Sequence, residues 1–229
     1  MKFNTLIFFL APIVIVKVVA IFYTNFDLFG DEAQYWVWSL NLDFGYYSKP
    51  PLLSWIIYIF TSLFGSSFEA LKLIPFFIYF LTTYIIFLLS YELYQKKDLA
   101  IMTAFSFFLL PSVTVSSFLL STDVILIFFW SLSLLSLIRL RKKPTNTNFL
   151  LLGIFLGISF LAKYAAVYFF LSLILIIIFD KKIRFIFFKN FFSTLLFVFT
   201  FISIILPNIF WNVKNDWVTI SHTSDNAGL

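Results

Sequence analysis

Two neighbouring carboxylates, Asp31 and Glu32, are the first residues of this sequence that could do chemistry. They precede a segment rich in tryptophan and tyrosine that reads as a helix. Carboxylates at the start of a helix commonly only cap it, because they accept hydrogen bonds from its unpaired N–H groups. The alternative is a general base or electrostatic partner at a membrane surface, where partial burial raises a carboxylate's proton affinity. Both interpretations stay open, and both hold if Asp31 acts in catalysis while Glu32 is structural.

Lys49 stands directly before two prolines, Pro50 and Pro51. A proline biases the residue before it toward extended backbone, so this lysine is held in a restricted conformation. A lysine at a membrane interface often only extends along apolar surface toward lipid headgroups. The alternative is a compact positive charge that binds a phosphate group.

Asp123 and the pair Lys163-Tyr164 lie at two further helix junctions. Asp123 follows Ser121 and Thr122 at the start of an apolar stretch, so capping is its ordinary explanation. Lys163 and Tyr164 separate two apolar stretches, where both residue types are common interface anchors. Two acids and two bases at four separate junctions are harder to explain one by one, and we predict that they share one site.

The composition is that of an integral membrane protein. The chain is 62% hydrophobic and only 12% charged, against about 25% charged in soluble domains. It has no cysteine and one histidine, His222, which disfavours zinc clusters and a Ser-His-Asp triad. The net charge of +5 lies in short clusters between apolar stretches, which indicates membrane topology and not nucleic acid. No motif calls for a cofactor, and nothing in the sequence supports a divalent metal.

The apolar stretches predict an all-α polytopic bundle of about seven spans in residues 1–206, since a span needs roughly 20 apolar residues. Residues 207–229 then begin an extracytoplasmic loop. The longest stretch is divided by Lys163-Tyr164 into two short helices. The predicted spans come from Leu6–Tyr23, Leu71–Tyr94, Leu99–Leu119 (interrupted by Pro111), Val124–Ile138, Phe149–Phe179 and Phe187–Leu206.

Residues 31–66 are predicted to lie along the membrane surface. Apolar residues recur there at helical spacing, at Ala33, Trp36, Val37 and Leu40. Such a helix is expected to place its tryptophan and tyrosine rings at headgroup level. Gly45 ends this segment, and the double proline precedes a second helix over Leu52–Phe64.

Basic clusters assign the two sides of the membrane. If the N-terminus is cytoplasmic and the spans alternate, eleven of the sixteen basic residues fall on the N-terminal side. The positive-inside rule makes that side cytoplasmic. The opposite side then receives Asp31, Glu32, Lys49, Asp123 and Lys163, although only the basic loops were used for the assignment. We therefore predict a multi-pass protein of the plasma (cell inner) membrane with an extracytoplasmic site.

At this point the residues resemble a known family. Residues 31–39 read DEAQYWVWS and residues 42–52 read LDFGYYSKPPL, which is similar to the first extracytoplasmic loop of the dolichyl-phosphate-mannose–protein mannosyltransferase-like family. Its bacterial members include the aminoarabinose transferase of lipid A. STD at 121–123, LAKYAA at 161–166, PNIFWN at 207–212 and NDW at 215–217 match later family segments in the same order. Thr122 stands where the family usually has proline.

The resemblance implies a C-type membrane glycosyltransferase that uses a lipid-linked sugar phosphate. Asp31 would be the catalytic aspartate, with Asp123 at the same cavity as a second catalytic candidate. Lys49 would hold the donor phosphate, together with Lys163 and Tyr164. Glu32, Tyr35 and Tyr46 would be supporting residues, and no residue would bind a metal.

The reaction implied is an inverting single displacement onto an extracytoplasmic lipid, glycan or protein. The partners are a lipid-linked sugar donor, membrane lipids and that acceptor, with no nucleic acid. Family members usually continue with further spans and often a soluble domain, so we expect this chain to be truncated at its C-terminus. The alternative function is a lipid-linked-sugar binding or transport protein without transferase activity.

Overall fold

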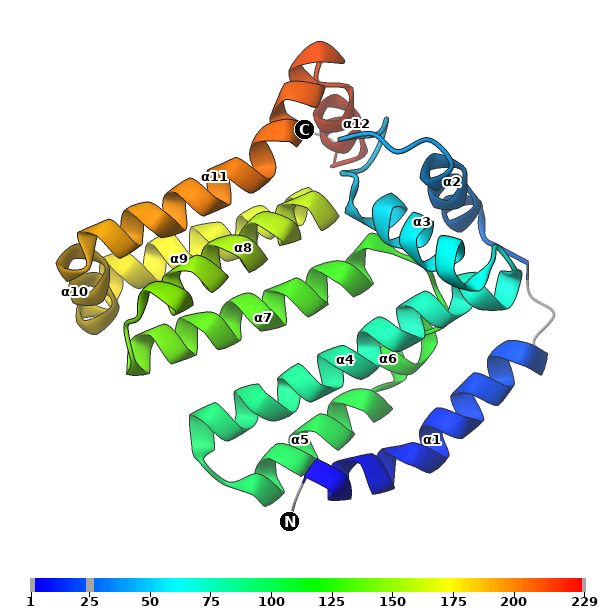
Figure 1. The fold of residues 1–229 in the computed structure, drawn as a ribbon, viewed down its shortest axis with the longest axis horizontal. Helices are drawn as coiled ribbons and strands as arrows, with labels where there is room; N and C mark the ends of the chain where they lie inside the picture. The colour runs from blue at the N-terminus through cyan, green and yellow to red at the C-terminus, as the bar shows by residue number, and fades with distance from the viewer. Residues whose placement is uncertain (1–2, 24–26, 228–229) are drawn as a thin grey trace.

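A computed structural model of the chain describes residues 3–23 and 27–227 (Figure 1). Within these ranges the regular elements are all helices and no strand is present, which confirms the all-α prediction. Among the described residues, three helices are long and apolar enough to cross a membrane, namely α4 (Phe68–Tyr94), α7 (Thr122–Lys142) and α11 (Phe191–Lys214). The chain is therefore a polytopic helical membrane protein.

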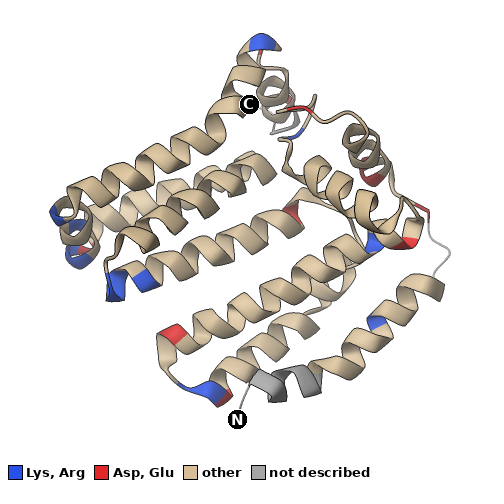
Figure 2. Cartoon of the chain, viewed as in Figure 1, with Lys and Arg blue, Asp and Glu red and all other residues tan. Residues whose placement is uncertain are grey.

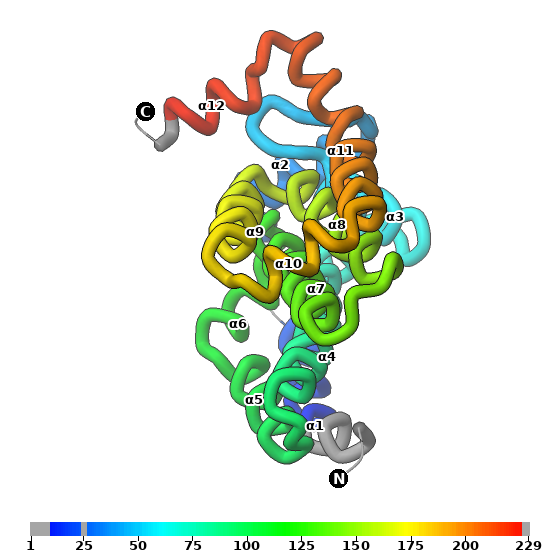
Figure 3. The backbone as a smooth tube through the Cα atoms, turned by 90° about the vertical axis from the view of Figure 1, so that its left-hand side faces the viewer, coloured from blue at the N-terminus to red at the C-terminus, as the bar shows by residue number. Residues whose placement is uncertain are grey.

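The bundle is built around α4, α7 and α8 (Asn146–Ala162). Helix α4 packs against α5 (Lys97–Leu109) and α7, and α8 packs against α7 and α11. α1 (Phe3–Tyr23) lies against α4 and α5. Figure 3 shows α6 (Pro111–Ser116) and α9 (Val167–Phe179) on one side of this stack, with α3 (Leu52–Phe64) and α11 toward the other.

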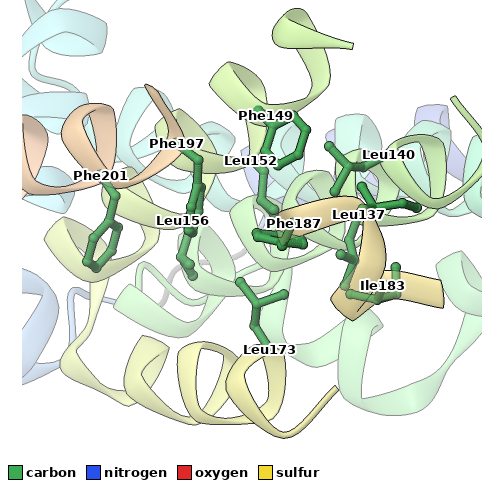
Figure 4. Close-up of a cluster of buried hydrophobic side chains, with 11 residues drawn as sticks. Leu137, Leu140, Phe149, Leu152, Leu156, Leu173, Ile183, Phe187, Phe197 and Phe201 are labelled. Carbon is green, nitrogen blue, oxygen red and sulfur yellow. The ribbon is translucent and has the colours of Figure 1, made fainter. Parts of the chain in front are cut away.

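The largest apolar cluster joins five helices, α7 to α11. Figure 4 shows Leu152 and Leu156 of α8 between side chains from its neighbours. Phe197 and Phe201 of α11 cover one part of this cluster, and Phe187 of α10 (Lys181–Lys189) covers another. These large aromatic and leucine side chains fix how α8 and α11 sit against each other.

Two glycines let α8 and α11 approach closely. A Cβ atom added at Gly153 would lie 2.7 Å from the backbone oxygen of Phe197, and one at Gly157 would lie 3.0 Å from Ile204. Small residues four apart are a common device for close helix packing in membranes. The α8–α11 contact therefore depends on these glycines.

Two predicted helix breaks are confirmed. Pro111 separates α5 from the short helix α6. Lys163 separates α8 from a single 3₁₀ turn, η1 (Tyr164–Ala166), which leads into α9. In each case a polar or proline residue interrupts one long apolar stretch.

The helix of the predicted last span does not end at Pro207, where we expected the polar tail to begin. Helix α11 begins at Phe191 and continues through Pro207 to Lys214, and a further helix, α12 (Val218–Ala227), follows. An internal proline removes one backbone hydrogen bond, and neighbouring polar groups can compensate within a bundle. Here Asn208 and Asn212 are buried on one face of the extension and hydrogen-bond to other elements, which holds it in helical form.

Most charged residues lie near the two ends of the bundle (Figure 2). Glu92 at the end of α4 pairs with Arg139 and Lys142 at the end of α7, and Arg141 pairs with Asp180 before α10. We call this the basic end. The opposite end carries α2 (Gly30–Ser39), α3 and α12, and we call it the site end.

The side chains that α2 buries against the protein are not those of its apolar face. The helix exists where we expected it, but it buries Glu32, Tyr35 and Ser39. Val37 and Leu40, from the predicted apolar face, are 55% and 66% exposed. An apolar face can be left outward where the surroundings are lipid, so the protein contacts are made by the side chains that form hydrogen bonds.

Candidate active site

The two adjacent carboxylates of the sequence have different surroundings. Glu32 is 2% exposed, and its oxygens lie 2.7 and 2.8 Å from the Lys72 ammonium. It also accepts hydrogen bonds from the backbone N–H of Leu120 at 2.7 Å and of Phe29 at 2.9 Å. Glu32 therefore joins α2 to the start of α4 and to the segment before α7, which is a structural task.

Asp31 is exposed on the adjacent face of α2. Its side chain makes no hydrogen bond or ion pair with another residue in the described ranges. It lines a cavity of about 410 Å³. The other residues of that wall are Phe29, Gly30, Glu32, Leu119, Leu120 and Ser121. The carboxylate is thus available to a molecule that enters this cavity.

Tyr35 lies within electrostatic range of both predicted catalytic aspartates. Its ring is buried against the start of α3 and α4. Burial raises the pKa of its phenol to about 12, and the negative charges of Asp31 and Asp123 add to that rise. Since such charge effects weaken with distance, Asp31 and Asp123 approach the same phenol from two elements. Tyr35 therefore stays protonated at neutral pH.

Asp123 and Lys163 form an ion pair across the start of α7 and the end of α8. The Lys163 ammonium lies 2.7 Å from the Asp123 carboxylate, and both side chains remain partly exposed. Ser121, and not Asp123, caps α7 by accepting a hydrogen bond from the Asp123 N–H at 3.2 Å. An acid and a base from these two junctions therefore lie side by side.

The Tyr164 hydroxyl contacts α11. Its hydroxyl donates to the Asn208 side-chain oxygen at 3.0 Å and accepts from the Asn212 amide nitrogen at 2.9 Å. Asn208 in turn donates to the backbone oxygen of Phe44 at 2.6 Å. Tyr164 thus connects η1 to α11 and, through Asn208, to the loop that carries Lys49.

That loop, residues 40–51, is held by Tyr46. The Tyr46 hydroxyl lies 3.0 Å from the carbonyl oxygens of Trp38 and Asn41, and its ring stacks on Trp38 at 4.9 Å. The Tyr46 N–H donates to the Lys49 carbonyl oxygen at 3.1 Å. This closes the turn that presents Lys49, whose side chain is partly buried and has no ion pair with a described residue.

The loop also docks on the last two helices. Thr219 of α12 donates to the Tyr46 carbonyl oxygen at 2.6 Å. Gly45 lies under the Trp211 ring, where an added Cβ would be 2.3 Å from a ring carbon. Only glycine fits this close approach, so the conformation of the Lys49 loop depends on α11 and α12.

Four of these residues were not identified from the sequence. Lys72 lies in the second turn of a long apolar helix, and a charge in such a position usually has a partner. Asn208 and Asn212 are four residues apart, a spacing that would mark one helix face had α11 been read through Pro207. Thr219 carries no local signal of its role.

Metal-ligating side chains do not gather in the described part of the chain. No group of three or more histidine, cysteine, aspartate or glutamate side chains could hold an ion there. His222 of α12 packs edge-on against Tyr47, with ring centroids 4.9 Å apart.

Comparisons with known proteins agree with the motifs at this site. The family model described as dolichyl-phosphate-mannose-protein mannosyltransferase matches residues 48–211, a range that includes Lys49, Asp123, Lys163 and Tyr164. The chain is also 33% identical over 216 residues to the lipid A galacturonosyltransferase RgtD of Rhizobium johnstonii. That alignment covers 92% of this chain but 44% of the relative, so the chain spans less than half of that protein's length. No solved structure matches. The matched segment takes in most of the helices and three of the four polar junctions described above, and the chain belongs to the dolichyl-phosphate-mannose-protein mannosyltransferase family.

Proposed function

We propose that the protein is a glycosyltransferase of the extracytoplasmic membrane face that takes its sugar from a polyprenyl-phosphate donor. The observation that supports this proposal most strongly is that two adjacent carboxylates have different surroundings. Glu32 is fixed by Lys72 and two backbone N–H groups, whereas Asp31 is open to a cavity. A carboxylate left free beside a fully satisfied one is suited to proton transfer.

In the proposed reaction Asp31 accepts the proton of an acceptor hydroxyl. The hydroxyl oxygen then forms a bond to the anomeric carbon of the sugar from the face opposite the phosphate. The bond from that carbon to the phosphate oxygen breaks, and the polyprenyl phosphate leaves with the electron pair. Phosphate departs without a general acid, and a single displacement of this kind inverts the anomeric centre.

Cations compensate the charge on the departing phosphate. Lys49 is the first candidate because it has no ion pair among the described residues and its loop is held in place by Tyr46. Lys163 is the second, and its partner Asp123 keeps it at the site until a phosphate competes for it. Preorganised charges of this kind stabilise the transition state because they need not move during the reaction.

An apolar cavity beside the site suits the donor's hydrocarbon tail. It has a volume of about 370 Å³ between α1, the start of α4 and α6. It shares Phe29 and Leu119 with the Asp31 cavity, and Lys72 lies in its wall. We propose that the isoprenoid chain occupies this cavity, with its phosphate toward the site end.

The acceptor class is proposed from the relative, whose name states that it acts on lipid A. A lipid acceptor shares the membrane with a lipid donor, so both substrates reach the site from the bilayer. We therefore rank a membrane lipid above a soluble glycan or a protein as the acceptor.

The test uses the full-length protein in liposomes, with labelled polyprenyl-phosphate hexose, hexuronic acid and pentose as donors. Asp31→Asn keeps size and shape but cannot act as a base, and we expect turnover to fall by about 10²–10⁴-fold. Donor binding should be nearly unchanged. Asp27→Asn, at another exposed aspartate nearby, is the matched control and should transfer at the wild-type rate.

Wild-type turnover in Asp31→Asn would remove this residue from the base role. Donor binding by the unsubstituted protein with no transfer to any acceptor would instead support the lipid-linked-sugar binding or transport function.

A further inference from the structure

A second cavity lies between α9, α11 and α12, with Tyr164 in its wall. Its volume is about 530 Å³, within the usual range for small-molecule sites. Its apolar walls include Phe160, Val167, Ile205, Ile209 and Ile220. None of the residues that line it is charged.

One buried polar atom of a residue in the wall of this cavity has no hydrogen-bond partner in the described part of the chain. Asn212 is 1% exposed, and its side-chain oxygen forms no hydrogen bond with the described residues. The orientation of the amide is determined by its nitrogen, which donates to the Asn208 backbone oxygen at 2.9 Å. A carbonyl oxygen only accepts, so the amide nitrogen must face it and the amide oxygen must face elsewhere. Buried acceptors are nearly always paired, and an unpaired one requires an explanation.

We infer that this cavity binds the acyl chain of the lipid acceptor, with a hydroxyl or amide N–H of that lipid donating to Asn212. The inference rests on the proposed function and assigns a place to its second substrate. The phosphodiester of the sugar donor carries no proton at neutral pH and its isoprenoid chain offers no donor, so neither of these parts satisfies Asn212. An acyl chain with a hydroxyl or amide near its head supplies both the apolar part and the donor.

The position of the cavity agrees with that task. Tyr164 lines it and directly follows Lys163, so its polar wall adjoins the proposed phosphate site. Exposed Tyr168 and Trp217 lie at its rim, and such rings are typical of the membrane interface. The donor tail cavity lies at a different set of helices, α1, α4 and α6, so two lipids can be bound together.

Photocrosslinking locates the two lipids without requiring turnover. One probe is an N-acyl glucosamine with a 3-hydroxyacyl chain that carries a diazirine, and the other is a diazirine-labelled polyprenyl phosphate. We expect the first probe to label peptides of α9, α11 or α12 around the cavity and the second to label α1, α4 or α6. Labelling of the α9–α12 cavity by the polyprenyl probe, or by neither probe, would overturn the inference.

Ile220→Trp fills the cavity from α12, and Val213→Trp adds the same side chain on an exposed part of α11 outside it. We expect only Ile220→Trp to weaken binding of the acyl probe, by about tenfold or more, while polyprenyl phosphate affinity stays unchanged in both variants. A 3-deoxyacyl probe tests the hydrogen bond. The wild type should prefer the hydroxylated probe by roughly 3–10-fold, as one neutral hydrogen bond allows, and Asn212→Leu should bind both probes equally.

These outcomes separate the inference from the proposed function. If the probes label the expected helices but no sugar is transferred, the lipid site is supported and the transferase function is contradicted. If sugar is transferred to a lipid acceptor and Ile220→Trp leaves the rate of transfer unchanged, the transferase function is supported and the lipid site in this cavity is contradicted.

Discussion

Lys72 and Glu32 form the most buried ion pair of the site end, and their contribution is structural. Their side chains are 6% and 3% exposed. Removing one partner of such a pair leaves an uncompensated charge in a place that water does not reach. For Lys72→Met we therefore expect the free energy of unfolding to fall by about 3–5 kcal/mol. Thermal unfolding in detergent measures this, with Lys214→Met as an exposed control at the same end.

The double variant Lys72→Met, Glu32→Gln sharpens that prediction. It removes both charges, so it should recover part of the stability that the single variant loses. Equal losses in the single and double variants would show that Glu32 does not depend on Lys72.

Lys49, unlike Lys72, is expected to bind the donor and not to stabilise the fold. Its ammonium has no acidic partner in the described ranges, so a donor phosphate would be its first charged contact. A charge-assisted hydrogen bond contributes roughly 1.5–3 kcal/mol, so Lys49→Ala should weaken donor binding by about tenfold or more. Thermal stability should change little. Lys49→Arg should recover only part, because a planar guanidinium is not a compact charge. Equilibrium binding of polyprenyl-phosphate sugar measures all three, and unchanged affinity in Lys49→Ala would leave this lysine as a headgroup anchor.

At the scale of elements, the helices themselves follow from local signals in the sequence. Apolar length, Pro111 and the polar Lys163-Tyr164 break were enough to place most helices within a few residues. Helix α3 was predicted with the bounds that it has, Leu52–Phe64, because the double proline before it and Gly65 after it are both local. Each of these signals lies within a few residues of the helix end that it determines.

The features that could not be predicted are those in which distant residues decide the local structure. Pro207 reads as a stop, but Asn208 and Asn212 of the following turns hydrogen-bond to Tyr164, more than forty positions earlier. The inward face of α2 is set by Lys72 and Leu120, which pair with Glu32 across 40 and 88 positions. Hydrophobic spacing within α2 carries no information about those partners. The acidic pair could therefore be found from the sequence, but its division into one fixed and one open carboxylate could not.

The close contact between α8 and α11 predicts that Gly153 cannot be replaced without cost. Even the small Gly153→Ala change places a methyl group 2.7 Å from the Phe197 backbone oxygen, which no side-chain rotation relieves. We expect α8 and α11 to separate slightly, at a cost of about 1–3 kcal/mol in the free energy of unfolding. Donor turnover should fall as well, since α11 positions the Lys49 loop through Asn208. Gly30→Ala is the control for stability alone, because an added Cβ there meets nothing within 4 Å but the residue lines the Asp31 cavity.

The two ends of the bundle carry different sets of charged residues. Acid–base pairs join α4, α7 and the start of α10 at the basic end, while the site end holds Asp31, Lys49, Asp123 and Lys163. We proposed from basic loops alone that the basic end is cytoplasmic. The chain has no cysteine, so single introduced cysteines report without background. Ser66 at the site end and Thr147 at the basic end are both exposed, which makes them suitable positions.

We expect Ser66→Cys to react with a membrane-impermeant thiol reagent on intact cells, and Thr147→Cys to react only after the membrane is opened. The physical reason is that lysine and arginine clusters beside spans are retained in the cytoplasm, which fixes every helix between them. A permeant reagent labels both variants and controls for expression and access. Labelling of Thr147→Cys but not of Ser66→Cys on intact cells would show that the protein has the opposite orientation in the membrane. The proposed site would then face the cytoplasm, where an extracytoplasmic acceptor could not reach it.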